Sequence, residues 1–199
     1  MRVSKTKQSV AAVLVLWASV LPAAEKDPVF KPAKLKAIDC QVSVPFGWSV
    51  YDQSTPECNA WVITPDDLDK ADYKTGVKIG VIDQVESRTG SKASKWVEAR
   101  VNDKTTSLPV IRSDAGPTNE YFQVRRLVTE EVYSPGRTEY VTFRTRYSWY
   151  WNDQHDVVIC VEARTPDKSW SALSEVLGVT EKLDFDVVAW KKKLAATKE

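Results

Sequence analysis

Apolar and polar residues alternate with a period of two along much of the chain, the pattern of β-strands with one buried face. The alternation is clearest at 141–151, where odd positions carry Val141, Phe143, Tyr147, Trp149 and Trp151, and even positions carry Thr142, Arg144, Arg146 and Ser148. Similar patterns, separated by turn residues, predict further strands at 38–44, 48–52, 58–64, 77–81, 108–112, 120–133 and 157–164. The segment Pro45-Phe46-Gly47 predicts a hairpin that joins the first two of these strands.

Two segments have helical spacing instead. Ser91 is a plausible N-cap for a helix that ends near Asn102 and places Ala93, Trp96, Val97 and Val101 on one face. A second helix follows Thr165-Pro166-Asp167. Strands in hairpins with a helix after each group predict an α+β domain built on a largely antiparallel, twisted sheet.

The first 24 residues have the features of a secretory signal peptide. A basic head precedes an uncharged apolar run from Val10 to Leu21, and Pro22-Ala23-Ala24 offers a cleavage site. The run is too short to span a bilayer, which takes roughly 20 apolar residues. We therefore expect a signal peptide at 1–24, an extended linker at 25–37, a single domain at 38–187 and a lysine-rich tail at 188–199.

Cleavage after Ala24 would leave 175 residues with 25 basic and 27 acidic side chains, a length that suits one domain. This balance argues against nucleic acid as a partner, because nucleic-acid binding needs a strongly cationic surface. We expect an exported protein, in a bacterial periplasm or secreted, with no integral membrane segment after cleavage.

Three cysteines allow at most one intramolecular disulfide in an oxidising compartment, and three pairings are possible. Cys40 and Cys58 are favoured because both stand at strand ends, where the backbone can adjust. Cys160, inside an apolar strand, is interpreted as a small buried hydrophobe.

The sequence offers little for catalysis or for a cofactor. The single histidine, His155, lies in a polar turn at 152–156, and no nucleophile or orienting carboxylate is identifiable for it. One histidine and three scattered cysteines do not form a zinc site, and the glycines form no run that could hold a phosphate. We expect no cofactor and no metal, with a hydrolase that uses His155 as the weakest alternative.

The best candidate for a binding surface is the polar face of the strand at 141–151. Tyr140, Arg144, Arg146 and Tyr150 share that face, and Arg125 from a nearby strand could join them. Tyr and Arg are enriched where proteins bind one another. The alternative is a solvated or helix-covered face whose arginines pair with Glu130, Glu131 or Glu139. On the apolar face, Trp149 and Trp151 are expected in the core, the alternative being a ligand pocket.

The order of these elements resembles the PsbP-like superfamily. The resemblance covers roughly 38–185 and rests on Val44-Pro45-Phe46-Gly47-Trp48, the strand Gly76–Val81, the helix with Trp96 and the segment Ala163-Arg164-Thr165-Pro166. It implies an α/β/α sandwich around an antiparallel sheet and, within the exported bacterial branch, a binding role without catalysis. The expected function is that of an exported binding or assembly protein with another exported protein as partner, and the alternative is a small-ligand carrier.

Overall fold

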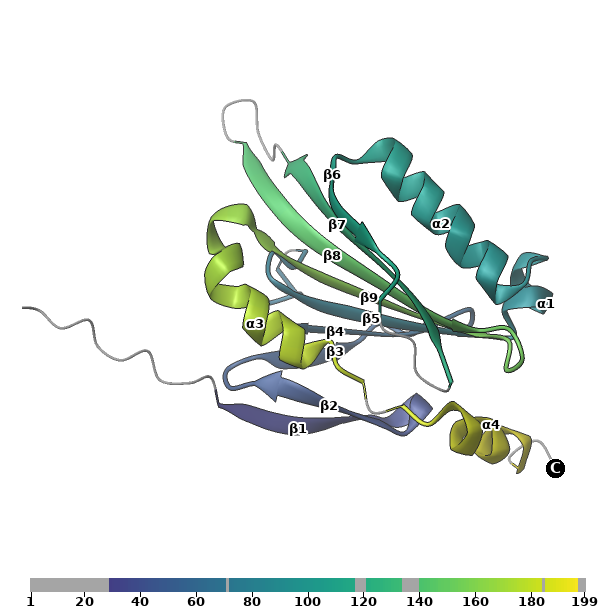
Figure 1. Cartoon of the computed structure of the whole chain (residues 1–199). Coiled ribbons are helices and arrows are strands. Elements are labelled where there is room, and N and C mark those ends of the chain that lie inside the picture. Colours follow the sequence, from purple (N-terminus) through teal and green to yellow (C-terminus); the bar gives the residue numbers. More distant parts are fainter. Residues whose placement is uncertain (1–28, 71, 117–120, 134–139, 184, 197–199) are drawn as a thin grey trace, which may run out of the picture.

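A seven-stranded antiparallel sheet forms the centre of the computed structural model, which describes residues 29–70, 72–116, 121–133, 140–183 and 185–196 (Figure 1). Every strand pairs antiparallel with its neighbours. In spatial order the strands are β3 (Ser49–Asp52), β4 (Asn59–Thr64), β5 (Gly76–Asp83), β9 (Val157–Pro166), β8 (Val141–Asn152), β7 (Gln123–Tyr133) and β6 (Val110–Asp114). The predicted strands and the antiparallel sheet are confirmed.

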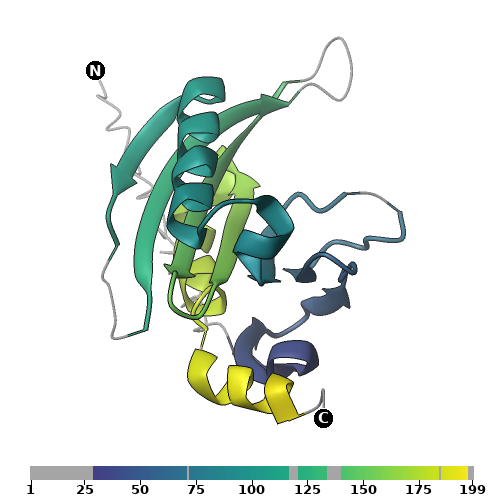
Figure 2. The same ribbon diagram turned by 90° about the vertical axis from the view of Figure 1, so that its right-hand side faces the viewer.

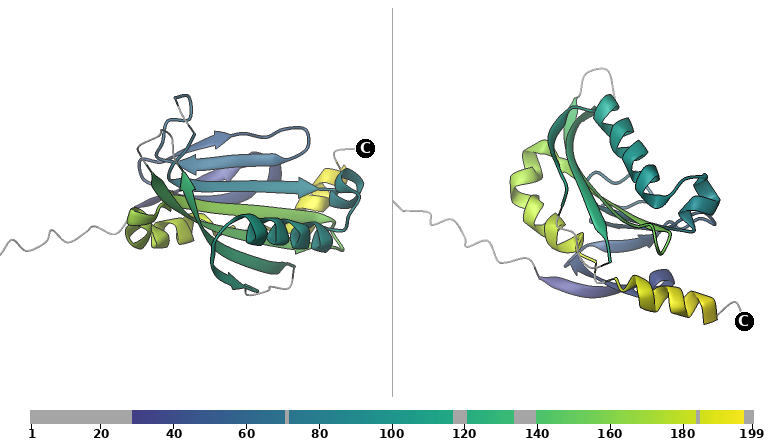
Figure 3. Two further views of the ribbon diagram at one scale, coloured as in Figure 1. Left: turned by 90° about the horizontal axis from the view of Figure 1, so that it is seen from above. Right: turned by 45° about the vertical axis from the view of Figure 1, so that its right-hand side comes forward.

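Helices cover both faces of this sheet (Figures 1 and 3). Helix α2 (Ala93–Ser107) and the short α1 (Val85–Thr89) lie on one side, which we call the α2 face. The opposite side, the α3 face, carries η2 (Asp167–Ser169) and α3 (Trp170–Thr180). The expected α+β class and its α/β/α layering are therefore confirmed.

Side-chain parity sends consecutive residues of each strand to opposite faces. On the α2 face, Val97 and Val101 of α2 pack with Leu127, Tyr147 and Trp149. A larger core on the α3 face joins β5 and β9 to Leu177 of α3. The two cores are thus separated by the sheet itself.

The segment expected to be a linker is largely folded. Phe30–Leu35 forms β1, which pairs along its whole length with β2 (Cys40–Pro45) after the 3-10 turn η1 (Lys36–Ile38). Together β1 and β2 make a separate two-stranded sheet, and Leu35 is fully buried. The expectation of a tether is therefore wrong for 30–37, because Leu35 and Ile38 provide buried apolar anchors.

The expected lysine-rich tail at 188–199 is a helix as far as the structure describes it, namely α4 (Val187–Ala196). Trp190 is buried, and its indole Nε1 donates a hydrogen bond to the carbonyl of Ala37 at 3.2 Å. Figure 2 shows α4 lying against the region of β1 and β2. The expectation of a tail is therefore wrong for 188–196, because the helix buries Val187 and Trp190 on one side and carries its lysines on the other.

Two further local expectations are wrong. The strands at 40–45 and 49–52 do not form a hairpin: β2 pairs with β1, and β3 pairs with β4, on either side of a turn with Gly47 at φ +84°. Ser91 does not cap α2; the first-turn amide of Ser94 donates instead to Asp153 Oδ1 at 2.8 Å. In both cases the hydrogen-bond partner differs from the nearby one that the local sequence predicts: β2 pairs with β1 instead of β3, and Asp153 instead of Ser91 accepts from the start of α2.

The signal-peptide prediction concerns residues 1–24, which lie outside the described residues. Among the helices that are described, none is both long and apolar enough to cross a membrane.

Candidate functional site

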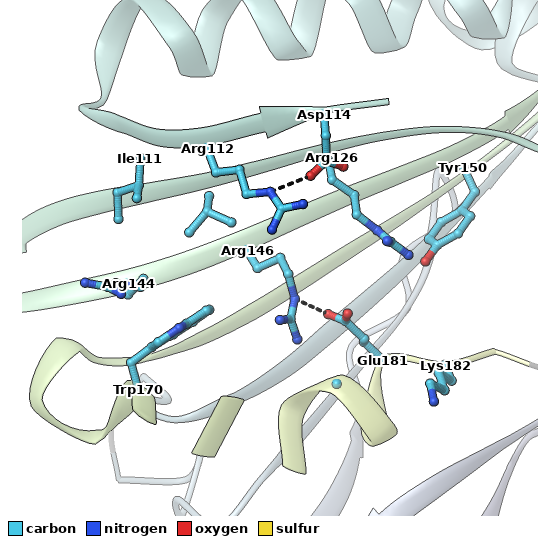
Figure 4. A pocket seen from close by; sticks show the side chains of 12 residues that line it. Ile111, Arg112, Asp114, Arg126, Arg144, Arg146, Tyr150, Trp170, Glu181 and Lys182 are labelled. Carbon is cyan, nitrogen blue, oxygen red and sulfur yellow. Dashed lines mark hydrogen bonds and ion pairs between the residues drawn. The ribbon is translucent and has the colours of Figure 1, made fainter. Parts of the chain in front are cut away.

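The main candidate site is a cavity of about 500 Å³ on the α3 face, which we call the arginine cavity (Figure 4). It lies where β6, β7 and β8 extend beyond the cover of α3. Its walls include Ile111, Val128, Tyr150 and Trp170 as well as five basic side chains and two acidic ones, namely Arg112, Arg126, Arg144, Arg146, Lys182, Asp114 and Glu181.

Strand register brings the arginines together. Arg146 on β8 stands opposite Val128 on β7, and Val128 stands opposite Arg112 on β6. Arg126, two residues before Val128 on the same face, stands opposite Ser148. Because residues directly opposite one another on neighbouring strands share a face, guanidinium groups from three strands point into the same space (Figure 4).

Several of these charges are neutralised by ion pairs. Arg144 Nη2 lies 3.1 Å from Glu130 Oε1 and 2.6 Å from Asp167 Oδ1. Arg112 Nε lies 2.9 Å from Asp114 Oδ2. The Glu130 pairing is one of those expected from the sequence. Arg126 and Lys182 form no ion pair with any other part of the chain that the structure describes, so they carry the excess positive charge.

Trp170, the first residue of α3, lies between two arginines. The guanidinium carbons of Arg144 and Arg146 are each 5.6 Å from the centre of its ring, within cation–π range. The indole therefore holds both side chains at the cavity wall and gives the site an aromatic surface.

Three buried guanidinium N–H groups have no partner within the described structure: Arg126 Nε, Arg144 Nε and Arg146 Nη2. A buried donor without an acceptor costs about 1–3 kcal/mol, so such groups are rare in folded proteins. All three belong to arginines that line one cavity, whose positive charge suits an anionic group such as a carboxylate.

Glu181 moderates this positive field. Its Oε2 accepts from Arg146 Nε at 2.9 Å, and its side chain is buried. Burial raises the pKa of the Glu181 carboxyl above its ordinary value, and the opposing effect of Arg146 is smaller. Protonation of Glu181 would free Arg146 and make the cavity more positive.

The structure brings together three of the five residues predicted for a partner surface: Arg144, Arg146 and Tyr150. Arg125 lies on the α2 face, opposite Trp149, and its Nη2 donates to Ser113 Oγ at 3.2 Å. Tyr140 is 72% exposed and lies outside the cavity. The predicted surface is therefore only partly one site.

Arg126 is the most important residue that the sequence did not indicate. Val124 and Val128 share its parity, so the sequence predicts an apolar face at Arg126 and a polar one at Arg125. The same face of β8 carries arginines, and the register between β7 and β8 was the missing information. Trp170, Glu181 and Lys182 come from α3 and the turn that follows it, which strand patterns do not place.

A second cavity, of about 360 Å³, lies on the α2 face beside Trp149, and we call it the Trp149 cavity. Trp149 is 5% exposed and stacks on Tyr147 with ring centres 5.5 Å apart, so it belongs to the core and to the cavity wall at once. Trp151 is partly buried against the same core and does not line the cavity.

His155 lies in the turn between β8 and β9, where its backbone amide donates to Asn152 Oδ1 at 2.8 Å. Within the described residues its imidazole forms no hydrogen bond with a Ser, Thr or Cys side chain, and three His, Cys, Asp or Glu residues nowhere gather as metal ligands.

The expected disulfide between Cys40 and Cys58 is not formed in the structure. Cys40 is buried in β2 of the two-stranded sheet. The Cys58 side chain lies beside Gly80 on β5 of the seven-stranded sheet. Because β1 takes the place next to β2 that the prediction gave to 48–52, Cys40 lies in the two-stranded sheet, whereas Cys58 directly precedes β4 of the seven-stranded sheet.

No protein-family model matches the sequence, and no match was found among curated proteins. Solved structures with a similar fold include PsbP (CyanoP) from Synechocystis sp. PCC 6803, at 12% identity and a TM-score of 0.48 over 82% of this chain and 96% of that one. LpqN of Mycobacterium tuberculosis, involved in cell envelope biogenesis, matches at 14% identity, TM-score 0.44, over 79% and 90%. The Ran-binding protein Mog1p of Saccharomyces cerevisiae matches at 15%, TM-score 0.44, over 75% and 84%. The expected structural resemblance to PsbP-like proteins is confirmed, as a resemblance of fold.

Proposed function

We propose that this protein is an exported, non-catalytic binding or assembly factor whose arginine cavity holds an acidic segment of another exported protein. The observation that carries the proposal is the uncompensated positive charge of one cavity, where Arg126 and Lys182 form no ion pair with any other part of the chain that the structure describes. A carboxylate placed there would neutralise these charges and accept charge-assisted hydrogen bonds from the Arg126 guanidinium and the Lys182 ammonium.

The chemistry of the cavity wall favours a protein segment over a bare inorganic anion. Trp170, Tyr150, Val128 and Ile111 give apolar contact area between the charged groups. Aromatic and arginine side chains in a partly desolvated depression are typical of the residues that dominate protein–protein affinity. In a segment with an acidic side chain flanked by apolar ones, the carboxylate would bind the basic groups and the apolar side chains would pack against the aromatic and aliphatic wall.

Neighbouring arginines provide a matched test. Arg125 and Arg126 are adjacent in sequence but lie on opposite faces of β7, and only Arg126 lines the cavity. We expect Arg126→Ala to weaken binding of a fluorescently labelled hexaglutamate peptide by about tenfold or more, since a hydrogen bond to a charged group contributes about 1.5–3 kcal/mol. Arg125→Ala should bind like the wild type. Equal affinities for the two folded variants would contradict the proposal.

The partner itself can be sought by photo-crosslinking in the native host. A benzophenone side chain at Ile111 lies in the cavity wall, whereas one at Tyr140 lies outside it, although both positions are exposed. We expect a discrete adduct from Ile111 that Arg126→Ala abolishes and that Tyr140 does not give. Protein recovered from the native host in this experiment also tests export. Its N-terminal sequence should begin close to Glu25 if the signal peptide is cleaved.

A second candidate function, carriage of a small ligand, is favoured by one observation. The Trp149 cavity is large enough for a small organic molecule, since ligand pockets typically measure about 300–1,000 Å³.

A further inference from the structure

We infer that the Trp149 cavity binds a small molecule with an apolar or aromatic body and one anionic group. This goes beyond the binding of a protein partner by the arginine cavity, because it concerns the opposite face of the sheet. It rests on the second candidate function, carriage of a small ligand, and gives that function a ligand class.

The floor of the cavity exists because three small residues fall in register. Ala60 on β4 stands opposite Gly80 on β5, and Gly80 stands opposite Cys160 on β9. The next strand, β8, places Trp149 opposite Cys160. The four residues that lie side by side across these strands are therefore three small ones and a tryptophan. The small residues leave a hollow, and the Trp149 indole forms one of its walls.

Gly80 is the centre of this hollow. A Cβ on Gly80 would lie 3.4 Å from Cys58 Sγ and 4.0 Å from the Cys160 Cβ, which are ordinary contact distances. The space above it is therefore not needed for close backbone packing, in contrast to Gly76, where a Cβ would come within 2.5 Å of the Ile63 carbonyl. The sequence keeps a strand-centre position empty that a side chain could fill.

The floor is apolar as well as small. Burial raises the pKa of the Cys160 thiol to about 12 and also raises the pKa of the Cys58 thiol. Both thiols are therefore neutral at pH 7 and act as soft apolar contacts. The stacked rings of Tyr147 and Trp149 form an apolar side wall next to this floor.

The rim supplies the charge. Lys78 stands opposite Glu162 across β5 and β9, so these two opposite charges are neighbours. Arg100 and Lys104, one turn apart on α2, line the cavity without an acidic partner in the described part of the chain. Lys104 Nζ lies 4.8 Å from the centre of the Tyr147 ring. Two uncompensated cations above an aromatic wall are complementary to an anionic group on an aromatic or aliphatic body.

Two probes of nearly the same shape test the inference. The aromatic sulfonate 8-anilinonaphthalene-1-sulfonate carries the anionic group, and N-phenyl-1-naphthylamine is the same skeleton without it. Fluorescence titration of the folded chain should show saturable binding of the sulfonate with about tenfold higher affinity than the neutral amine, as one favourable charge contact of about 1.4 kcal/mol would give.

Three variants separate the parts of the site. Lys104→Glu should weaken sulfonate binding about tenfold or more and leave the neutral probe unchanged, since one rim charge is reversed. Lys95→Glu, an exposed lysine on the same helix outside the cavity, is the matched control and should have no effect. Gly80→Ala, which partly fills the floor at ordinary contact distances, should weaken both probes. Melting temperature and near-ultraviolet circular dichroism check that each variant is folded.

Each outcome decides a different statement. Equal affinity for the two probes, or equal effects of Lys104→Glu and Lys95→Glu, would overturn the anionic ligand class but leave small-ligand carriage standing. If the probes bind saturably and Gly80→Ala does not weaken their binding, the probe site is not the Trp149 cavity. Failure of both probes to bind at millimolar concentration would overturn carriage and the ligand class together. The peptide assay on the arginine cavity is unaffected by any of these results.

Discussion

The two faces of the seven-stranded sheet use the same strands for opposite chemistry. On β8, Trp149 closes the core under α2, while Arg146, three residues earlier, reaches into a polar cavity beside α3. On β7, Arg126 lines that cavity, while its neighbour Arg125 lies on the α2 face. One face is built around stacked aromatic rings and the other around paired and unpaired charges.

The difference follows from how little of the sheet one helix can cover. Seven strands about 4.8 Å apart span roughly 29 Å, whereas a helix with its side chains is about 10–12 Å wide. Helix α2 packs on β8 and β9 and leaves the side of β4 and β5 open, where the Trp149 cavity lies. Helix α3 packs on β5 and β9 and leaves β6 and β7 open, where the arginine cavity lies. The cavities therefore occupy diagonally opposite parts of the sandwich.

Removing Trp149 should have the largest effect on stability. Its side chain is 5% exposed and stacked on Tyr147, so Trp149→Ala removes a large buried side chain from the core on the α2 face. We expect the free energy of unfolding to fall by about 3–5 kcal/mol, measured by urea denaturation. Trp170→Ala, at the half-open wall of the arginine cavity, should cost clearly less. Equal losses would show that both faces are packed to the same degree.

Breaking the Arg146–Glu181 pair should have the next largest effect. Arg146→Ala leaves the buried Glu181 carboxylate without its cation, and we expect a loss of up to about 3 kcal/mol in the free energy of unfolding. Arg126→Ala should cost less, because it removes a buried donor that has no partner. Adding Glu181→Gln to Arg146→Ala should recover part of the loss. A greater cost for Arg126→Ala than for Arg146→Ala would reverse these assignments.

The pH dependence of stability should report on Glu181. Its pKa is raised in the fold by burial, against the smaller lowering effects of Arg146, Arg126 and Lys182. The folded chain therefore holds this proton more tightly than the unfolded chain does. Its contribution to stability is complete below the ordinary pKa of 4.5 and is lost as the pH rises through the raised value.

Urea denaturation at several pH values above 4.5 measures this effect as the difference between the wild type and Glu181→Gln. The wild type should lose stability relative to the variant as the pH rises. In the same range, a sulfotyrosine peptide, whose charge is constant, should bind the wild type more tightly at the lower pH, because protonated Glu181 frees Arg146. Identical pH profiles for the two proteins would remove Glu181 from the account of the arginine cavity.

The period-two pattern predicted the fold class well because a sheet strand imposes its parity on every residue. The alternation at 141–151 placed both Trp149 and Arg146 on the correct opposite faces. Local pattern failed where a distant segment decided the structure. Taken alone, the sequences of β1 and α4 are typical of charged, extended segments. In the structure β1 is anchored by burial of Leu35 and α4 by burial of Trp190.

The candidate sites were harder to predict for the same reason. Parity within β8 found Arg144, Arg146 and Tyr150, but the contribution of Arg126 depends on the register between two strands. The Trp149 cavity depends on Ala60, Gly80 and Cys160 falling opposite one another on three strands, of which β9 is far from β4 and β5 in sequence. Single-sequence periodicity carries no information about such coincidences.

The smallest effect is expected at His155, which lies at the end of the sheet in the β8–β9 turn and lines neither cavity. The turn is held through the His155 backbone amide, which donates to Asn152 Oδ1, so truncating the imidazole removes no hydrogen bond from it. His155→Ala should change the free energy of unfolding by less than about 0.5 kcal/mol, as is usual for a surface substitution. Binding of the hexaglutamate peptide and of the naphthalene sulfonate should also stay within twofold of the wild type, roughly the same free energy. A folded His155→Ala protein that loses its biological activity while both cavities still bind their probes would move the function to the turn and favour the hydrolase.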